Sequence, residues 1–217
     1  MGNVPGQTMF EKRVYVEQNL DQLRALLLFE PRGAVWHNAN IVLPSNNPEA
    51  SLGYVILEST EYPAMSGSNT MCVATVLLET GMLPMAEPVT ELVLESPAGL
   101  IRVHCECRDG KVIRAKLYNQ PAFVYYQREA IDVPRVGQLT VDVAYGGMTY
   151  VLVDAADLGF VLHPDEGRAL CEVGQRIKTA AAEQLEVEHP STPTFPASPR
   201  PRSPGRCRPR RRRSLLQ

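Results

Sequence analysis

The 217-residue sequence lacks any apolar segment long enough to cross a membrane. The longest apolar run near its start, residues 26–29, is far short of the roughly 20 residues that a spanning helix needs. Residues 1–20 also lack the apolar core of a signal peptide. Cysteine is scarce: the five present have no framework spacing, which argues against a secreted disulfide scaffold. These absences predict a cytoplasmic protein with no membrane partner.

Common catalytic and metal-binding patterns are missing too. There is no phosphate-binding loop, no dinucleotide-binding fingerprint and no Ser/His/Asp order typical of a hydrolase. The His-Cys-Glu-Cys segment at residues 104–107 contains zinc-ligand types, but a strand would place Cys105 and Cys107 on the same face as Val103. No second Cys/His pair completes a site, so we expect these cysteines in the core and no metal ion.

Charge is distributed unevenly along the chain. Residues 1–189 contain 24 acidic and 14 basic side chains, a net charge of −10, whereas residues 190–217 contain eight basic and no acidic ones. The Pro/Arg-rich composition predicts a disordered tail over residues 189–217. Through this tail alone the protein could bind nucleic acid by charge. Our preferred explanation for the tail is a shift of reading frame in the coding DNA.

Periodicity predicts helices and strands in an α+β arrangement. A capping box at Thr8 and Glu11 begins a helix that continues at helical spacing until Pro31. Residues 52–58 are predicted to form a buried strand, and a central helix follows that stops at Gly81. Further strands are predicted at residues 89–94, 101–107, 111–119, 139–144 and 148–153. These segments predict a curved, mainly antiparallel sheet around one central helix.

The turn between the buried strand and the central helix is the best candidate for a functional site. At the helix N-terminus, unpaired backbone N–H groups and the positive end of the helix dipole favour an anion. Gly67 would let a ligand approach the backbone closely, and Ser66 would stand beside it. The alternative is that Ser66 only caps the helix. Cys72 falls on the apolar stripe of the helix and is expected in the core.

The sequence at this turn resembles the proline racemase family. Residues 65–70 read Met-Ser-Gly-Ser-Asn-Thr where the family usually has Met-Cys-Gly-His-Gly-Thr. Further similarity lies at residues 9–13, 30–33, 73–75, 78–81, 96–99 and 143–147. The resemblance covers about residues 4–188. It implies that residues 1–188 form one half of a two-domain proline racemase/diaminopimelate epimerase-like fold, incomplete at its start.

The family resemblance also implies an activity. Its members are cofactor-independent enzymes that remove the α-proton of proline or a hydroxyproline with one base and reprotonate the opposite face with another. Ser66 stands at the position of the first base, and Gly67, Ser68, Asn69 and Thr70 stand where the substrate carboxylate is held. The second base, normally a cysteine, would belong to a half that this chain lacks. A homodimer is kept as a hypothesis.

Departures from the family pattern leave alternatives open. A free thiol has a pKa near ~8.5 and can ionise at a helix end, whereas the Ser66 hydroxyl is far harder to ionise. Ser68 replaces a histidine and so removes a titratable group. Besides a hydroxyproline epimerase, we therefore consider a trans-3-hydroxy-L-proline dehydratase and an inactive, carboxylate-binding half-enzyme. In the segment of residues 36–40, Asn38 is a candidate for recognising a substrate hydroxyl, with a structural turn as the alternative.

Overall fold

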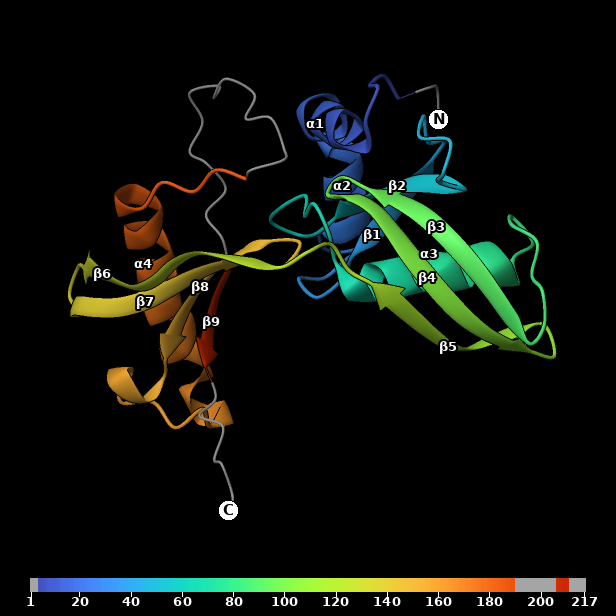
Figure 1. Ribbon diagram of the computed structural model, residues 1–217. Coiled ribbons are helices and arrows are strands. Elements are labelled where there is room, and N and C mark those ends of the chain that lie inside the picture. Colours follow the sequence, from blue (N-terminus) through green and yellow to red (C-terminus); the bar gives the residue numbers. More distant parts are fainter. Residues whose placement is uncertain (1–3, 190–205, 211–217) are drawn as a thin grey trace, which may run out of the picture. The chain divides into compact units, whose positions relative to one another are not determined.

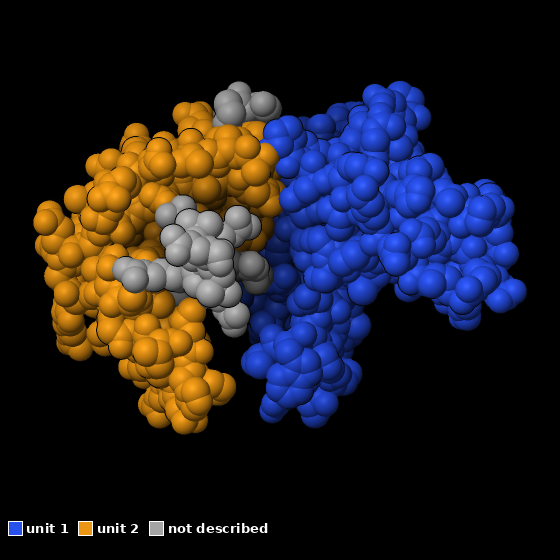
Figure 2. Space-filling model, turned by 60° about the horizontal axis from the view of Figure 1, so that its bottom comes forward, with its two compact units in different colours: residues 1–121 blue, residues 122–217 orange. Residues whose placement is uncertain are grey.

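The computed structural model describes residues 4–189 and 206–210. The chain divides into two compact units, Met1–Pro121 and Ala122–Gln217, which Figure 2 colours separately. Each unit combines helices with an open sheet, so the predicted α+β class is confirmed. The sequence predicts one half-domain over residues 1–188, whereas in the structure the chain passes from one unit to the other after residue 121.

The first unit is built on one five-stranded sheet (Figure 1). Its strand order is β1-β2-β3-β4-β5, and every neighbouring pair is antiparallel except β2 and β3. The elements of the unit are α1 (Met9–Asn19), α2 (Asp21–Leu28), β1 (Ala39–Leu43), β2 (Leu52–Leu57), α3 (Gly67–Glu79), β3 (Val89–Ser96), β4 (Gly99–Arg108) and β5 (Lys111–Tyr118). The sequence predicts all of these except β1 and the separation of α1 from α2.

The first predicted helix is two helices in the structure. It begins as expected, since Thr8 Oγ1 accepts a hydrogen bond from the Glu11 N–H at 3.2 Å. The helical backbone is interrupted at Leu20, where α1 ends and α2 begins. This break lets Val16 of α1 and Leu28 of α2 pack in the same apolar cluster. A continuous helix rises about 1.5 Å per residue and would carry the two side chains far apart.

Helix α3 packs against the sheet and carries the candidate site at its N-terminus. Its buried residues Val73 and Leu77 belong to one cluster with Leu94 of β3 and Ile101 of β4. Cys72 is exposed, so its predicted position in the core is wrong. With 3.6 residues per turn, Cys72 points about 100° away from Val73 and away from the buried stripe.

The two cysteines of β4 lie in the core, as predicted. Cys105 is fully buried and Cys107 is 4% exposed. Burial raises the pKa of Cys105 to about 11, which keeps its thiol protonated near neutral pH. Among the described residues, no cluster of three His, Cys, Asp or Glu side chains could hold a metal ion. No helix in the described part of the chain has the length and apolar character to cross a membrane.

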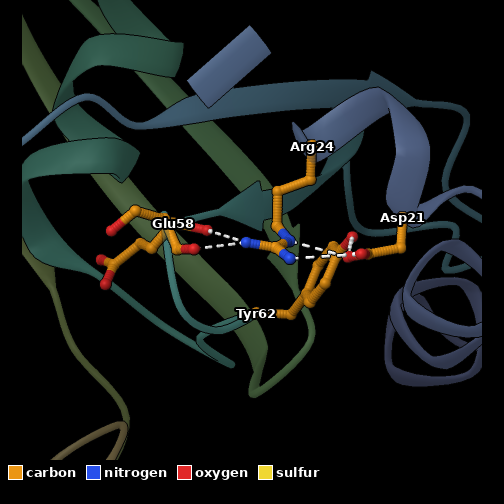
Figure 3. A network of polar contacts seen from close by, with 5 residues as sticks. Asp21, Arg24, Glu58 and Tyr62 are labelled. Carbon is orange, nitrogen blue, oxygen red and sulfur yellow. Dashed lines mark hydrogen bonds and ion pairs between the residues drawn. The ribbon is translucent and has the colours of Figure 1, made fainter. Parts of the chain in front are cut away.

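A polar network fixes α2 to the loop after β2 (Figure 3). Arg24 Nε pairs with Asp21 Oδ1 at 2.7 Å, and Arg24 Nη1 donates to the carbonyl oxygens of Glu58 and Ser59. The Tyr62 hydroxyl donates to Asp21 Oδ1 at 2.8 Å. The hydrogen bond from Arg24, with a smaller contribution from Tyr62, lowers the pKa of the Asp21 carboxyl.

This network predicts an acid-sensitive contribution to stability. The folded-state pKa of Asp21 lies below its unfolded value of about 3.9, so the contribution is complete above about pH 4 and is lost as the pH falls through the folded-state pKa. Asp21→Asn should therefore flatten the decline in unfolding free energy between pH 5 and pH 3, measured by urea denaturation. Asp109→Asn, at an exposed carboxylate, is the control. An unchanged acid dependence in Asp21→Asn would contradict the prediction.

The second unit has a sheet of its own. The strand order is β6-β7-β8-β9, antiparallel except for the parallel pair β8 and β9. Its elements are β6 (Phe123–Val133), β7 (Gly137–Tyr145), β8 (Thr149–Asp154), the 3₁₀ turns η1 (Ala156–Leu158) and η2 (Pro164–Glu166), α4 (Gly167–Gln184) and β9 (Arg206–Arg210). Helix α4 buries Ile177, Ala180 and Ala181 in the cluster formed with this sheet.

Two features of this unit differ from the sequence analysis. Strand β6 is not predicted, because register shifts between Val124 and Tyr126 and between Tyr126 and Glu129 interrupt the alternation that marks a strand. Residues 206–210, assigned to the disordered tail, form β9 along β8. A strand edge offers unpaired backbone groups to which such a segment can bond. Residues 190–205 and 211–217 of the predicted tail lie outside the described residues.

Candidate functional site

The turn into α3 holds Ser66 at the N-cap position. Its backbone is extended, with φ −146° and ψ 123°, but its side chain accepts no hydrogen bond from the backbone of the first turn. Ser66 Oγ instead accepts a hydrogen bond from Asn69 Nδ2 at 2.9 Å. Ser66 therefore occupies the N-cap position without a hydrogen bond from its side chain to the helix backbone.

The first turn of α3 keeps backbone donors open. The Thr70 N–H bonds to the Ser66 carbonyl oxygen at 3.0 Å. In the described part of the chain, the N–H groups of Gly67, Ser68 and Asn69 have no acceptor. The first turn contains no acidic side chain that would occupy this positive helix end. Three free N–H groups at the start of a helix are the arrangement that binds carboxylates and phosphates.

Gly67 leaves space beside these donors. A Cβ at position 67 would meet Leu117 Cδ2 at 3.5 Å, which is an ordinary van der Waals contact. Gly67 adopts a helical conformation that every residue type can adopt. The fold of this unit therefore does not require glycine at position 67.

Thr70 supports the turn from the interior. It is fully buried, and its Oγ1 donates to the Ser66 carbonyl oxygen at 2.8 Å. Because that proton is used, the Tyr54 hydroxyl must be the donor in the 2.5 Å hydrogen bond between Tyr54 and Thr70 Oγ1. Burial raises the pKa of Tyr54 to about 12, so this donor stays protonated. The sequence carries no signal for this role of Tyr54, which lies within an apolar strand.

A second amide reaches the turn from β1. Asn40 Nδ2 donates to Asn69 Oδ1 at 2.8 Å, so the two amides and the Ser66 hydroxyl form a continuous chain. Asn38, which the sequence suggests as the polar contact, is exposed. Ser68 is also exposed, with its Oγ 3.3 Å from Ser66 Oγ. Of the predicted site residues, Ser66, Gly67, Ser68 and Asn69 thus surround one point at the helix end, whereas Thr70 faces inward.

This arrangement can perform two chemical tasks at once. The open N–H groups can neutralise a carboxylate, and the partly exposed Ser66 hydroxyl lies beside them with one lone pair taken by Asn69. Where the exposed Ser68 hydroxyl is the donor in the 3.3 Å hydrogen bond between the two serines, the Ser66 proton is available for transfer to a bound molecule. A carboxylic acid that exchanges a proton on the carbon next to its carboxylate fits both groups.

Comparisons with known proteins point to one family. The proline racemase family model matches residues 1–198. A hydroxyproline epimerase from Agrobacterium vitis, solved with trans-4-hydroxy-L-proline, is 36% identical with a TM-score of 0.81, over 88% of this chain and 56% of that one. A probable proline racemase from Agrobacterium radiobacter K84, solved with carbonate, is 35% identical with a TM-score of 0.81. The match covers 88% of this chain and 57% of that one. The present chain thus spans little more than half the length of these proteins.

Proposed function

Because this chain belongs to the proline racemase family, we propose that it binds a hydroxyproline and exchanges the proton on its α-carbon, as a hydroxyproline 2-epimerase does. The observation that carries the proposal is the open helix end beside Ser66. Further support comes from the two similar structures, one of which contains trans-4-hydroxy-L-proline and the other the anion carbonate.

In the proposed mechanism the substrate carboxylate sits on the N–H groups of Gly67, Ser68 and Asn69. Those dipoles offset the negative charge that grows on the carboxylate side as the α-proton leaves, and so stabilise the carbanion-like transition state. Ser66 Oγ delivers a proton to one face of the α-carbon, or takes one from it in the reverse direction. A second base removes or returns the proton on the opposite face, and we assign no residue of this chain to it.

Two alternatives have different support. A protein that only binds a carboxylate would need just the helix end of the first unit. This hypothesis is supported by the short span of the chain relative to its relatives. A dehydratase would need a hydroxyl leaving from C3, whereas the A. vitis protein was solved with a 4-hydroxylated ligand, which supports epimerisation. Loss of the substrate α-proton into deuterated water, without release of a dehydrated product, distinguishes the epimerase from both.

The proposal includes further expectations. The chemistry assigned to Ser66 and the helix end requires no cofactor. Cys72, Cys105, Cys107 and Cys171 are free thiols, which supports a reducing compartment such as the cytoplasm. The homodimer and nucleic-acid binding by the tail stay predictions.

Gly67→Ala is the direct test of the carboxylate site. The new Cβ meets no obstacle in the protein, and alanine favours a helix over glycine, so thermal stability should be equal or slightly higher. Affinity for trans-4-hydroxy-L-proline should fall about tenfold or more, because the methyl group occupies the approach to the N–H groups, a loss of ~1.4 kcal/mol. Isothermal titration measures the affinity, and trans-4-hydroxy-L-prolinamide, which lacks the carboxylate, is the control ligand. Equal affinities of the Gly67→Ala and unmodified proteins would contradict the proposed site.

A further inference from the structure

The Ser66 side chain is held away from the place where a helix-capping serine normally lies. A serine at the N-cap usually accepts a hydrogen bond from the backbone N–H two or three residues later, here that of Ser68 or Asn69. In this structure its Oγ accepts from the Asn69 side chain instead. The hydrogen bond from the Asn69 amide thus holds Ser66 Oγ in a position where it does not cap the backbone.

The orientation of the Asn69 amide is itself determined by a neighbour. An asparagine side chain has one end that only donates and one that only accepts. Asn40 Nδ2 is a donor 2.8 Å from Asn69 Oδ1, which directs the NH₂ end of Asn69 toward Ser66. Asn69 is buried, with 4% of its surface exposed, so water competes little for these groups.

We propose that Asn40 is a positioning residue: acting through Asn69, it holds the Ser66 hydroxyl off the backbone N–H groups and so keeps the helix end open for the substrate carboxylate. The identity of the ligand in this inference rests on the proposed function. The hydrogen bonds that link Asn40, Asn69 and Ser66 do not depend on it. Without Asn40, the Asn69 amide can rotate so that its oxygen faces Ser66. The Ser66 hydroxyl then accepts a hydrogen bond from the backbone N–H groups and competes for them with the substrate carboxylate.

The binding test compares three proteins: the unmodified protein, Asn40→Ala, and the double variant Asn40→Ala with Ser66→Ala. Asn40→Ala should weaken binding of trans-4-hydroxy-L-proline about fivefold, the equivalent of the ~1 kcal/mol contributed by one helix cap. Adding Ser66→Ala to Asn40→Ala removes the competing cap, so the double variant should bind more tightly than Asn40→Ala alone. A merely structural contribution of Asn40 would not be rescued in this way. Binding by Asn40→Ala equal to that of the unmodified protein, or no rescue, would overturn the inference.

A stability cycle tests the same inference without ligand. Ser66→Ala removes the acceptor of the buried Asn69 amide in the unmodified protein but a helix cap in the Asn40→Ala background, so local stability is read from hydrogen exchange of the Ser68 and Asn69 backbone amides. Ser66→Ala should not change their protection in the unmodified protein, where Ser66 does not bond to them, but should lower it in the Asn40→Ala background. Equal changes of protection in both backgrounds would overturn the inference. If the unmodified protein binds neither trans-4-hydroxy-L-proline nor carbonate, the proposed function fails, while this cycle still decides the positioning by Asn40.

Suitable controls exist within the chain. Asn40→Ala also removes a buried oxygen, Oδ1, that accepts no hydrogen bond from the described residues, so the variant is expected to fold. Asn69→Ala removes the donor to Ser66 directly and should reproduce the effect of Asn40→Ala. Asn19→Ala, which removes an exposed amide that donates to the Tyr15 carbonyl oxygen, should change neither the affinity nor the cycle.

Discussion

Ser66→Ala is expected to slow α-proton exchange of trans-4-hydroxy-L-proline by about 10²–10⁴-fold, the usual contribution of a general acid–base group. Binding should be retained, because the backbone N–H groups at the start of α3 do not depend on the serine side chain. Proton NMR of the full 217-residue chain with substrate in deuterated water measures the exchange. Isothermal titration on the same sample measures the binding.

Two further variants test whether the Ser66 hydroxyl itself transfers the proton. Ser66→Cys should restore exchange, and its rate should rise with pH as the thiol ionises, because the helix end lowers a thiol pKa from about 8.5. Ser59→Ala, which removes a hydroxyl bonded to the Val35 carbonyl oxygen, is the serine control. Exchange by Ser66→Ala at the unmodified rate would refute proton transfer by Ser66. Binding without exchange in the unmodified chain would favour the binding-only alternative.

Leu77→Ala is expected to lower the free energy of unfolding of the first unit by about 2–5 kcal/mol. Leu77 is fully buried in the cluster that joins α3 to β3 and β4, so its removal leaves a cavity under the helix that carries the site. Urea denaturation followed by far-UV circular dichroism measures the loss. Hydrogen exchange should show weaker protection of the amides of α3.

The neighbouring residue provides the matched control for this core substitution. Val76 is on the same helix but 54% exposed, so Val76→Ala should change the free energy of unfolding by less than about 0.5 kcal/mol. Similar losses for Leu77→Ala and Val76→Ala would mean that α3 does not pack through the face described above. A large effect of Val76→Ala alone would mean that the exposed face of α3 is covered in solution.

Local patterns determined the elements around the site. The alternation of apolar residues predicted β3 and β4, and the capping box predicted the start of α1 at Thr8. The predicted strand over residues 52–58 and the stop at Gly81 bracketed the central helix, which begins at Gly67. These features depend on residues close together in the chain, whose periodicity and turn chemistry are visible in the sequence. The same patterns, with the family resemblance, predicted an anion site there.

Contacts between segments far apart in the chain decided the features that the sequence did not predict. The break at Leu20, the exposed face of Cys72 and the division after residue 121 depend on which surfaces pack together. The capping residue Ser66 caps nothing, because Asn40, 26 positions earlier in the printed sequence, orients Asn69. The sequence by itself thus determined where a helix end with a hydroxyl would stand. Only the tertiary structure decided that this helix end stays open, since that depends on the hydrogen bond from Asn40 of β1 to Asn69 of α3.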